Sequence, residues 1–239
     1  MPQVDPFSLP FLEAIDFLKR KINLPTAVGE TLSNEIHAKA FTIAGEMKMD
    51  ILADFHTAIN KMIAEGLTIH DFRQEFDSIV EKYGWDYKGS RGWRSQVIYE
   101  TNLQSAYQEG SYRQATDPDT LKAFPFWRYR TAGDTRVRPE HAAWDGTILR
   151  ADDPWWDTHY PYRGDTYNWF GCRCDVEVIT EEEYNELADK PGYRTTPPDE
   201  TGQGKSEALG YEAALARKLA SIPEELRQAF LADLERLNQ

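Results

Sequence analysis

The stretch Phe126-Trp127-Arg128-Tyr129-Arg130-Thr131 decides the fold class of this 239-residue chain. Its aromatic side chains at Trp127 and Tyr129 alternate with arginines, which is the period of a β-strand with one buried face. The residues before this stretch have helical spacing instead. The change of pattern predicts an α+β protein with a mainly helical N-terminal module, a small mixed α/β module and a C-terminal helical tail.

Upstream of the strand, apolar residues recur every three or four positions, which predicts helices over about 11–22, 32–65, 68–83 and 93–113. The second would be the longest, with an apolar stripe from Ile36 through Ala40 and Ile43 to Met62. Thr68 and Asp71 have the spacing of a capping box at the start of the third helix. Residues 1–116 are therefore expected to form the helical module.

Residues 117–190 are expected to form the mixed module. Short strands are predicted at 146–149 and 175–179, with a long loop over 150–170 between them. Thr180 and Glu183 predict a capped helix. A polar linker over 191–205 then leads to two short helices in the tail, 206–239, which we expect to form a partner-binding arm.

The charge of the chain limits its partners. Forty acidic residues against 27 basic ones give a net charge of -13, so attraction of the whole surface to nucleic acid is disfavoured. Any DNA contact would be local, and Lys88, Arg91 and Arg94 before the fourth helix are the candidates. No stretch approaches the roughly 20 apolar residues of a membrane-spanning helix, so no membrane partner is expected.

Four residues of the mixed module offer the ligand types that zinc prefers: His141, His159, Cys172 and Cys174. Pro139 can open a short helix carrying His141, with Asp145 four residues on as a carboxylate that could orient the imidazole. Two interpretations stay open. The four residues bind zinc, or they form a buried thiol pair beside two hydrogen-bonded histidines. The two cysteines form no disulfide framework, which favours a reducing compartment.

The long loop also contains a group of acidic residues, namely Asp152, Asp153, Asp157 and Asp165. Carboxylates of this kind act as general acids and bases or as Mg²⁺ ligands, and together with the cysteines and histidines they would suit a metal-dependent hydrolase or nuclease. The competing interpretation is turn chemistry, because Asp-Asp-Pro is also typical of a solvated turn.

Three separated motifs resemble the phage Mu F-like domain of bacteriophage head morphogenesis proteins. They are residues 134–146 with Asp134, Arg136, Pro139, His141 and Asp145-Gly146, residues 153–161 with Asp153-Pro154 and His159, and Gly171-Cys172-Arg173-Cys174. They occur in the order found in that family. Similar strings lie upstream at 37–45 and 101–107, so the resemblance spans about residues 7–180.

The resemblance implies a minor head protein of a tailed bacteriophage or prophage, needed for procapsid assembly and associated with the portal and the inner capsid. The portal protein and the major capsid protein would be its partners, in the host cytoplasm during assembly and in the virion afterwards. It implies a structural protein rather than an enzyme. A related branch of minor head proteins has an apparent zinc site in the same segments, with cysteines where this chain has Arg138 and His141.

Overall fold

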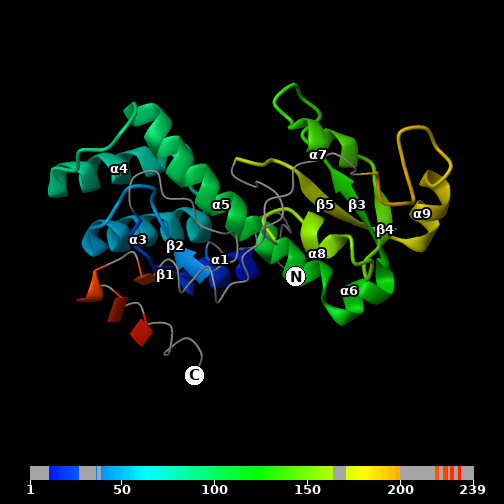
Figure 1. Ribbon diagram of the computed structural model, residues 1–239, viewed down its shortest axis with the longest axis horizontal. Helices are drawn as coiled ribbons and strands as arrows, with labels where there is room; N and C mark the ends of the chain where they lie inside the picture. The colour runs from blue at the N-terminus through cyan, green and yellow to red at the C-terminus, as the bar shows by residue number, and fades with distance from the viewer. Residues whose placement is uncertain are drawn as a thin grey trace, which may run out of the picture. The chain divides into compact units, whose positions relative to one another are not determined.

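The computed structural model describes residues 11–26, 36, 39–163 and 171–199, with short stretches between 219 and 232. The chain divides into two compact units, Met1–Gly110 with Gly210–Gln239, and Ser111–Leu209. Helices and small sheets both occur (Figure 1), so the predicted α+β class is confirmed. Part of the predicted linker lies outside the described residues. Most of the predicted tail, and with it the expected partner-binding arm, also lies outside them.

The first unit packs helices against a two-stranded sheet (Figure 1). Its elements are α1 (Leu12–Lys19), β1 (Ile22–Asn23), β2 (Ala40–Phe41), α3 (Met49–Glu65), α4 (Ile69–Tyr83) and α5 (Arg91–Ala115), whose last residues belong to the second unit. Strands β1 and β2 are parallel, with Ile22 opposite Ala40 and Asn23 opposite Phe41.

The helix predicted over 32–65 is confirmed from Met49 to Glu65, but the chain before Met49 is not one continuous helix. Residues 27–35, 37 and 38 lie outside the described part, and Ile36 and Lys39 are helical. Ala40 and Phe41 then form β2, and α3 begins only at Met49. Gly45 between them has a φ of 79°, in the left-handed region that a continuing helix does not contain. Ile43 is buried all the same, so at this position the apolar spacing reflected burial in a segment that is not helical.

The third predicted helix is confirmed in detail. The Thr68 hydroxyl accepts from the backbone N–H of His70, and the Asp71 carboxylate accepts from the backbone N–H of Thr68 at 2.9 Å, which completes the capping box of α4. Gly84 ends the helix in the left-handed conformation that a C-terminal cap requires.

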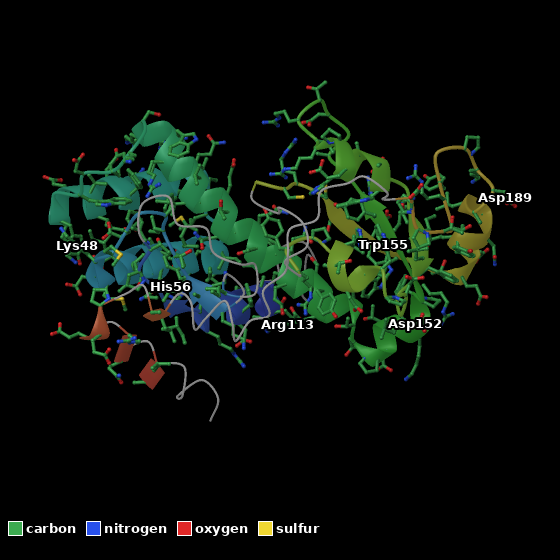
Figure 2. The ribbon with its side chains drawn as sticks, in the orientation of Figure 1. Lys48, His56, Arg113, Asp152, Trp155 and Asp189 are labelled. Carbon is green, nitrogen blue, oxygen red and sulfur yellow. The ribbon has the colours of Figure 1, made fainter. Side chains whose placement is uncertain are left out.

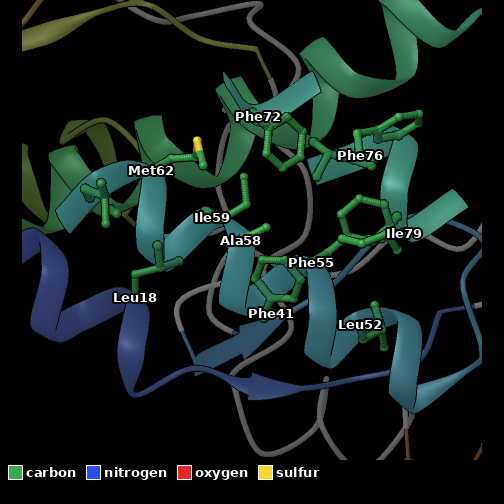
Figure 3. Packing of buried hydrophobic residues seen from close by; sticks show 14 of the residues in the cluster. Leu18, Phe41, Leu52, Phe55, Ala58, Ile59, Met62, Phe72, Phe76 and Ile79 are labelled. Carbon is green, nitrogen blue, oxygen red and sulfur yellow. The ribbon is translucent and has the colours of Figure 1, made fainter. Parts of the chain in front are cut away.

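The core of the first unit is formed largely by α3 and α4, whose buried side chains Figure 3 shows. Phe55 is fully buried, with ring centroids 5.6 Å from Phe76 and 5.3 Å from Trp85. Aromatic rings in such tilted arrangements add favourable contacts to the burial of apolar surface.

The second unit contains a three-stranded antiparallel sheet in the order β4-β3-β5 (Figure 1). Its elements are α6 (Pro118–Ala123), β3 (Phe126–Arg130), α7 (Pro139–Trp144), β4 (Ile148–Arg150), α8 (Trp156–His159), β5 (Asp175–Ile179) and α9 (Glu181–Leu187). The Thr180–Glu183 capping box of α9 is confirmed. Strand β4 begins two residues later than predicted.

The strand that decided the fold class is the central strand of this sheet. Trp127 and Tyr129 of β3 are buried, and the residues beside them are less so, which confirms the predicted alternation. Their rings belong to a core of aromatic side chains that also contains Trp144, Trp155, Trp156 and Tyr160. Among the described residues, no helix has the length and apolar composition needed to cross a membrane.

Candidate metal centre

Two segments of the second unit supply the candidate ligands. Pro139 occupies the first turn of α7, where a missing N–H costs nothing, and His141 follows on the buried side of that helix. On the other side of the site, Gly171 has a φ of 65° and turns the chain into Cys172-Arg173-Cys174, which leads directly into β5.

The structure brings three of the four predicted ligands together. Nδ1 of His141 lies 3.4 Å from Sγ of Cys172 and 3.5 Å from Sγ of Cys174. The ligand atoms of these three residues all lie within 4.8 Å of one another, and all three residues are buried. The backbone N–H of Cys174 also points at Sγ of Cys172, at 3.4 Å.

Aromatic side chains enclose this cluster. The His141 ring stacks on Trp144, with 4.7 Å between centroids. The hydroxyl of Tyr162 donates a hydrogen bond of 2.9 Å to the carbonyl oxygen of Cys172. Tyr162 has a φ of 63°, which is rare for a residue with a side chain, so this hydrogen bond accompanies a strained backbone conformation.

The two thiols differ in pKa because they are hydrogen-bonded to each other and Cys174 receives further side-chain hydrogen bonds that favour its thiolate. Hydrogen bonding with Cys172, and then with His141 and Tyr129, lowers the pKa of Cys174. Hydrogen bonding to Cys174 and burial raise the pKa of Cys172. Burial, with the neighbouring sulfur atoms, raises the pKa of Tyr129. The contacts around Cys174 therefore favour its thiolate form over that of Cys172.

An ion pair at the surface of the unit anchors the cysteine segment. Both terminal nitrogens of Arg173 donate to the carboxylate of Asp134, at 2.7 and 2.8 Å. This two-point contact lowers the pKa of Asp134, and a hydrogen bond from the backbone N–H of Arg136 lowers it further. The contact joins the loop before α7 to the residue between the two cysteines.

His159 lies in a different environment. Its Nδ1 atom is 2.7 Å from the carbonyl oxygen of Trp155 and 2.8 Å from the hydroxyl of Thr158. Its ring contacts Trp144 edge-on, with centroids 4.8 Å apart. His159 is buried in α8 but is not part of the group of three ligand atoms.

Sequence reasoning missed the side chains that surround the cluster. The alternation along β3 marks Tyr129 as buried, but it does not say that its hydroxyl approaches Cys174. Nothing in the sequence signals the left-handed conformation of Tyr162 or its bond to Cys172.

A model of the family described as "Phage Mu protein F like protein" matches residues 53–177, which is more than half of the chain and includes all three clustered residues. The chain belongs to this family. The resemblance noted in the sequence is therefore confirmed.

Two curated relatives extend the similarity of this Mu F-like chain. It is 30% identical over 200 residues to the "Putative capsid assembly protein F" of Escherichia phage Mu, covering 77% of this chain and 44% of that protein. It is 34% identical over 155 residues to the "Mu-like prophage FluMu F protein" of Haemophilus influenzae, covering 61% and 36%. The chain thus spans less than half the length of either relative. No solved structure matches it significantly.

Two of the loop aspartates of this Mu F-like chain, Asp152 and Asp153, make ordinary local contacts. Asp152 forms an ion pair with Arg150 and is exposed at the surface, whereas Trp155 nearby is buried (Figure 2). The Asp153 carboxylate accepts from the backbone N–H of Trp155 at 2.9 Å, which is turn chemistry. Asp165 lies outside the described residues. The carboxylate of Asp145 accepts from the backbone N–H of Thr131 at 2.7 Å.

The basic residues proposed for local DNA contact are only partly available. Arg94 is 7% exposed, and its guanidinium donates to the carbonyl oxygen of Ala44. Arg91 is exposed but donates two hydrogen bonds to Asp77, the longer at 2.6 Å. Lys88 is exposed. A phosphate would have to compete with Asp77 for Arg91, and Arg94 cannot reach it without leaving the core.

Proposed function

We propose that this Mu F-like chain is a minor head protein of a tailed bacteriophage or prophage and acts in assembly of the procapsid. The observation that carries this proposal is the similarity to the phage Mu protein named as a putative capsid assembly protein. That similarity covers 77% of the chain, which is more than either compact unit alone, so residues of both units share it.

The chain would be a low-copy component associated with the portal protein and the inner face of the capsid, where it meets the major capsid protein. It would reach this place during assembly in the host cytoplasm and remain in the virion. The name of the phage Mu relative, "Putative capsid assembly protein F", supports a place among the head proteins, and the resemblance of the sequence motifs to head morphogenesis proteins is the ground for these partners.

The contacts of the chain favour a structural role over an enzymatic one. A metal-dependent hydrolase or nuclease of the kind considered from the sequence would use His159 and the loop aspartates as metal ligands or as general acids and bases. Asp152 pairs with Arg150, Asp153 caps a turn, and His159 is held by Trp155. These residues contribute to the fold of the second unit, and the chain would act through its surfaces.

The test uses the phage or prophage that encodes the chain. A nonsense mutation in its gene is expected to abolish infectious particles and to leave aberrant or empty heads, and a plasmid copy of the wild-type gene should restore them. Chemical cross-linking in purified procapsids should join the chain to the portal protein or the major capsid protein. Normal yields of infectious particles without the chain would contradict the proposal.

A second assay addresses the enzymatic alternative. The purified chain is incubated with single- and double-stranded DNA in the presence of Zn²⁺, Mg²⁺ or Mn²⁺, and no cleavage is expected. Cleavage that disappears in a Cys172→Ser variant of intact fold would favour the hydrolase over the structural role.

A further inference from the structure

We propose that His141, Cys172 and Cys174 bind one zinc ion, which joins helix α7 to the segment that enters β5, and that His159 is not a ligand. The proposal concerns the stability of the second unit and is independent of the role in head assembly. It rests on the distances between the three side chains, on their burial and on the groups around them.

The distances are those of a tetrahedral zinc site. Zinc binds sulfur at about 2.3 Å and imidazole nitrogen at about 2.0–2.1 Å, so at tetrahedral angles the two ligand atoms lie about 3.6 Å apart. Nδ1 of His141 lies 3.4 and 3.5 Å from the two sulfur atoms. One ion can therefore contact all three atoms with little movement of the backbone.

The chemistry of the three residues also fits zinc. Two thiolates and a neutral imidazole balance the two positive charges of the ion, which matters because all three residues are at most 3% exposed.

Hydrogen bonds of the kind that surround metal-bound thiolates are already in place. The backbone N–H of Cys174 donates to Sγ of Cys172, and the Tyr162 hydroxyl holds the carbonyl oxygen of the same residue. Groups of this kind orient the ligands and tune the metal. The stacking of His141 on Trp144 fixes the plane of the imidazole.

The proposed ligand set has three members because the contacts of His159 keep its ring away from the other three side chains. Its contacts to Trp155 and Thr158 place it in the aromatic core, outside the group whose atoms lie within 4.8 Å. A zinc ion with three protein ligands keeps one further position for water or another donor. The four-residue set expected from the sequence is thus reduced to three.

The experiment measures metal in the full chain purified after expression in zinc-supplemented medium. We expect about one zinc per chain, and on replacement by Co²⁺ a sulfur-to-cobalt charge-transfer band with intense visible bands of a tetrahedral site. An organomercurial that modifies the two thiols should release the zinc, which a coloured chelator detects in the wild-type protein. A chain that contains no zinc and shows no Co²⁺ bands would overturn the proposal.

Variants then assign the ligands. Cys172→Ser, Cys174→Ser and His141→Gln should each lose the zinc, and His159→Gln, a matched control, should keep it. Near-UV circular dichroism identifies any variant that fails to fold. If a cysteine variant does not fold, release of zinc from the wild-type protein by the organomercurial shows whether the thiols are ligands. Zinc retained by a folded Cys172→Ser/Cys174→Ser double variant would overturn the site, and zinc lost from a folded His159→Gln variant would overturn the three-residue set.

Discussion

The ring of His159 stacks on the ring of Trp155, with 4.0 Å between centroids and 8° between planes. The Nδ1 atom of the same histidine lies 2.7 Å from the carbonyl oxygen of Trp155. His159 therefore closes a turn of α8 with its side chain and fills the aromatic core with its ring.

Replacing His159 with alanine should destabilise the second unit. The change removes a buried ring and a hydrogen bond, so the free energy of unfolding should fall by about 1–3 kcal/mol. Urea unfolding followed by tryptophan fluorescence measures this change. His70→Ala is the control, because His70 is exposed, and it should leave the unfolding curve almost unchanged. Equal stability of both variants would contradict the packing role.

Removing the metal should lower the melting temperature of the wild-type chain. If zinc joins α7 to the segment before β5, its binding free energy contributes to folding and is lost on chelation. A calorimetric scan with and without a strong zinc chelator measures the effect. The Cys172→Ser/Cys174→Ser variant, which has no site to empty, should melt at the same temperature in both scans. A zinc-containing wild-type chain that melts unchanged after chelation would show that the ion does not support the fold.

Lys21 should make the stability of the first unit depend on pH. Burial lowers the pKa of Lys21 to about 7, opposed by the charge of Glu109. Between about pH 7 and pH 10.5 the unfolded chain binds more protons at this residue than the folded chain, so the free energy of unfolding rises with pH in that window. Below about pH 7 both states bind the proton, and the full cost of burying the charge is present.

Lys21→Met tests this pH dependence. The variant should be more stable than the wild type by on the order of a few kcal/mol at pH 6, and the difference should shrink as the pH approaches 10. Chemical denaturation at several pH values gives the comparison. Lys19→Met, in the same segment but exposed, is the matched control and should not change the slope. A constant difference between Lys21→Met and wild type at all pH values would refute the prediction.

Gly146→Ala should strongly destabilise the second unit. Gly146 has a φ of 73°, and an added Cβ would overlap the carbonyl oxygen of Gly192. The clash would also disturb the hydrogen bonds from Gly146 to Tyr129 and from Arg194 to Gly146. We expect a loss of several kcal/mol or failure to fold.

Gly133→Ala separates the effect of backbone strain from the effect of the clash with Gly192. Gly133 has a similar φ of 67°, but a Cβ there would meet no atom within 4 Å, so only the backbone strain of about 1 kcal/mol is expected. Thermal melts of both variants make the comparison. Similar losses in the two variants would show that strain, and not the contact with Gly192, determines the requirement at Gly146.

Local sequence determined the elements whose signals lie within a few residues. The capping boxes at Thr68 and Thr180 were predicted, and so was the alternation of Trp127 and Tyr129 in β3. In each capping box the two partners lie three residues apart, and in β3 the alternation of buried and exposed side chains follows from the geometry of a single strand, so a local pattern predicts these features.

The tertiary structure decided what depends on distant partners. The apolar spacing before α3 fitted a helix, but Phe41 pairs in register with Asn23 and forms a strand. The spacing of His141, His159, Cys172 and Cys174 does not distinguish ligands from packing residues. Only the folding of α7 against the entry to β5 brings His141 to the two sulfur atoms, while stacking on Trp155 keeps His159 apart. Contacts across some 30 residues depend on how the elements pack, and no local pattern in the sequence encodes that packing.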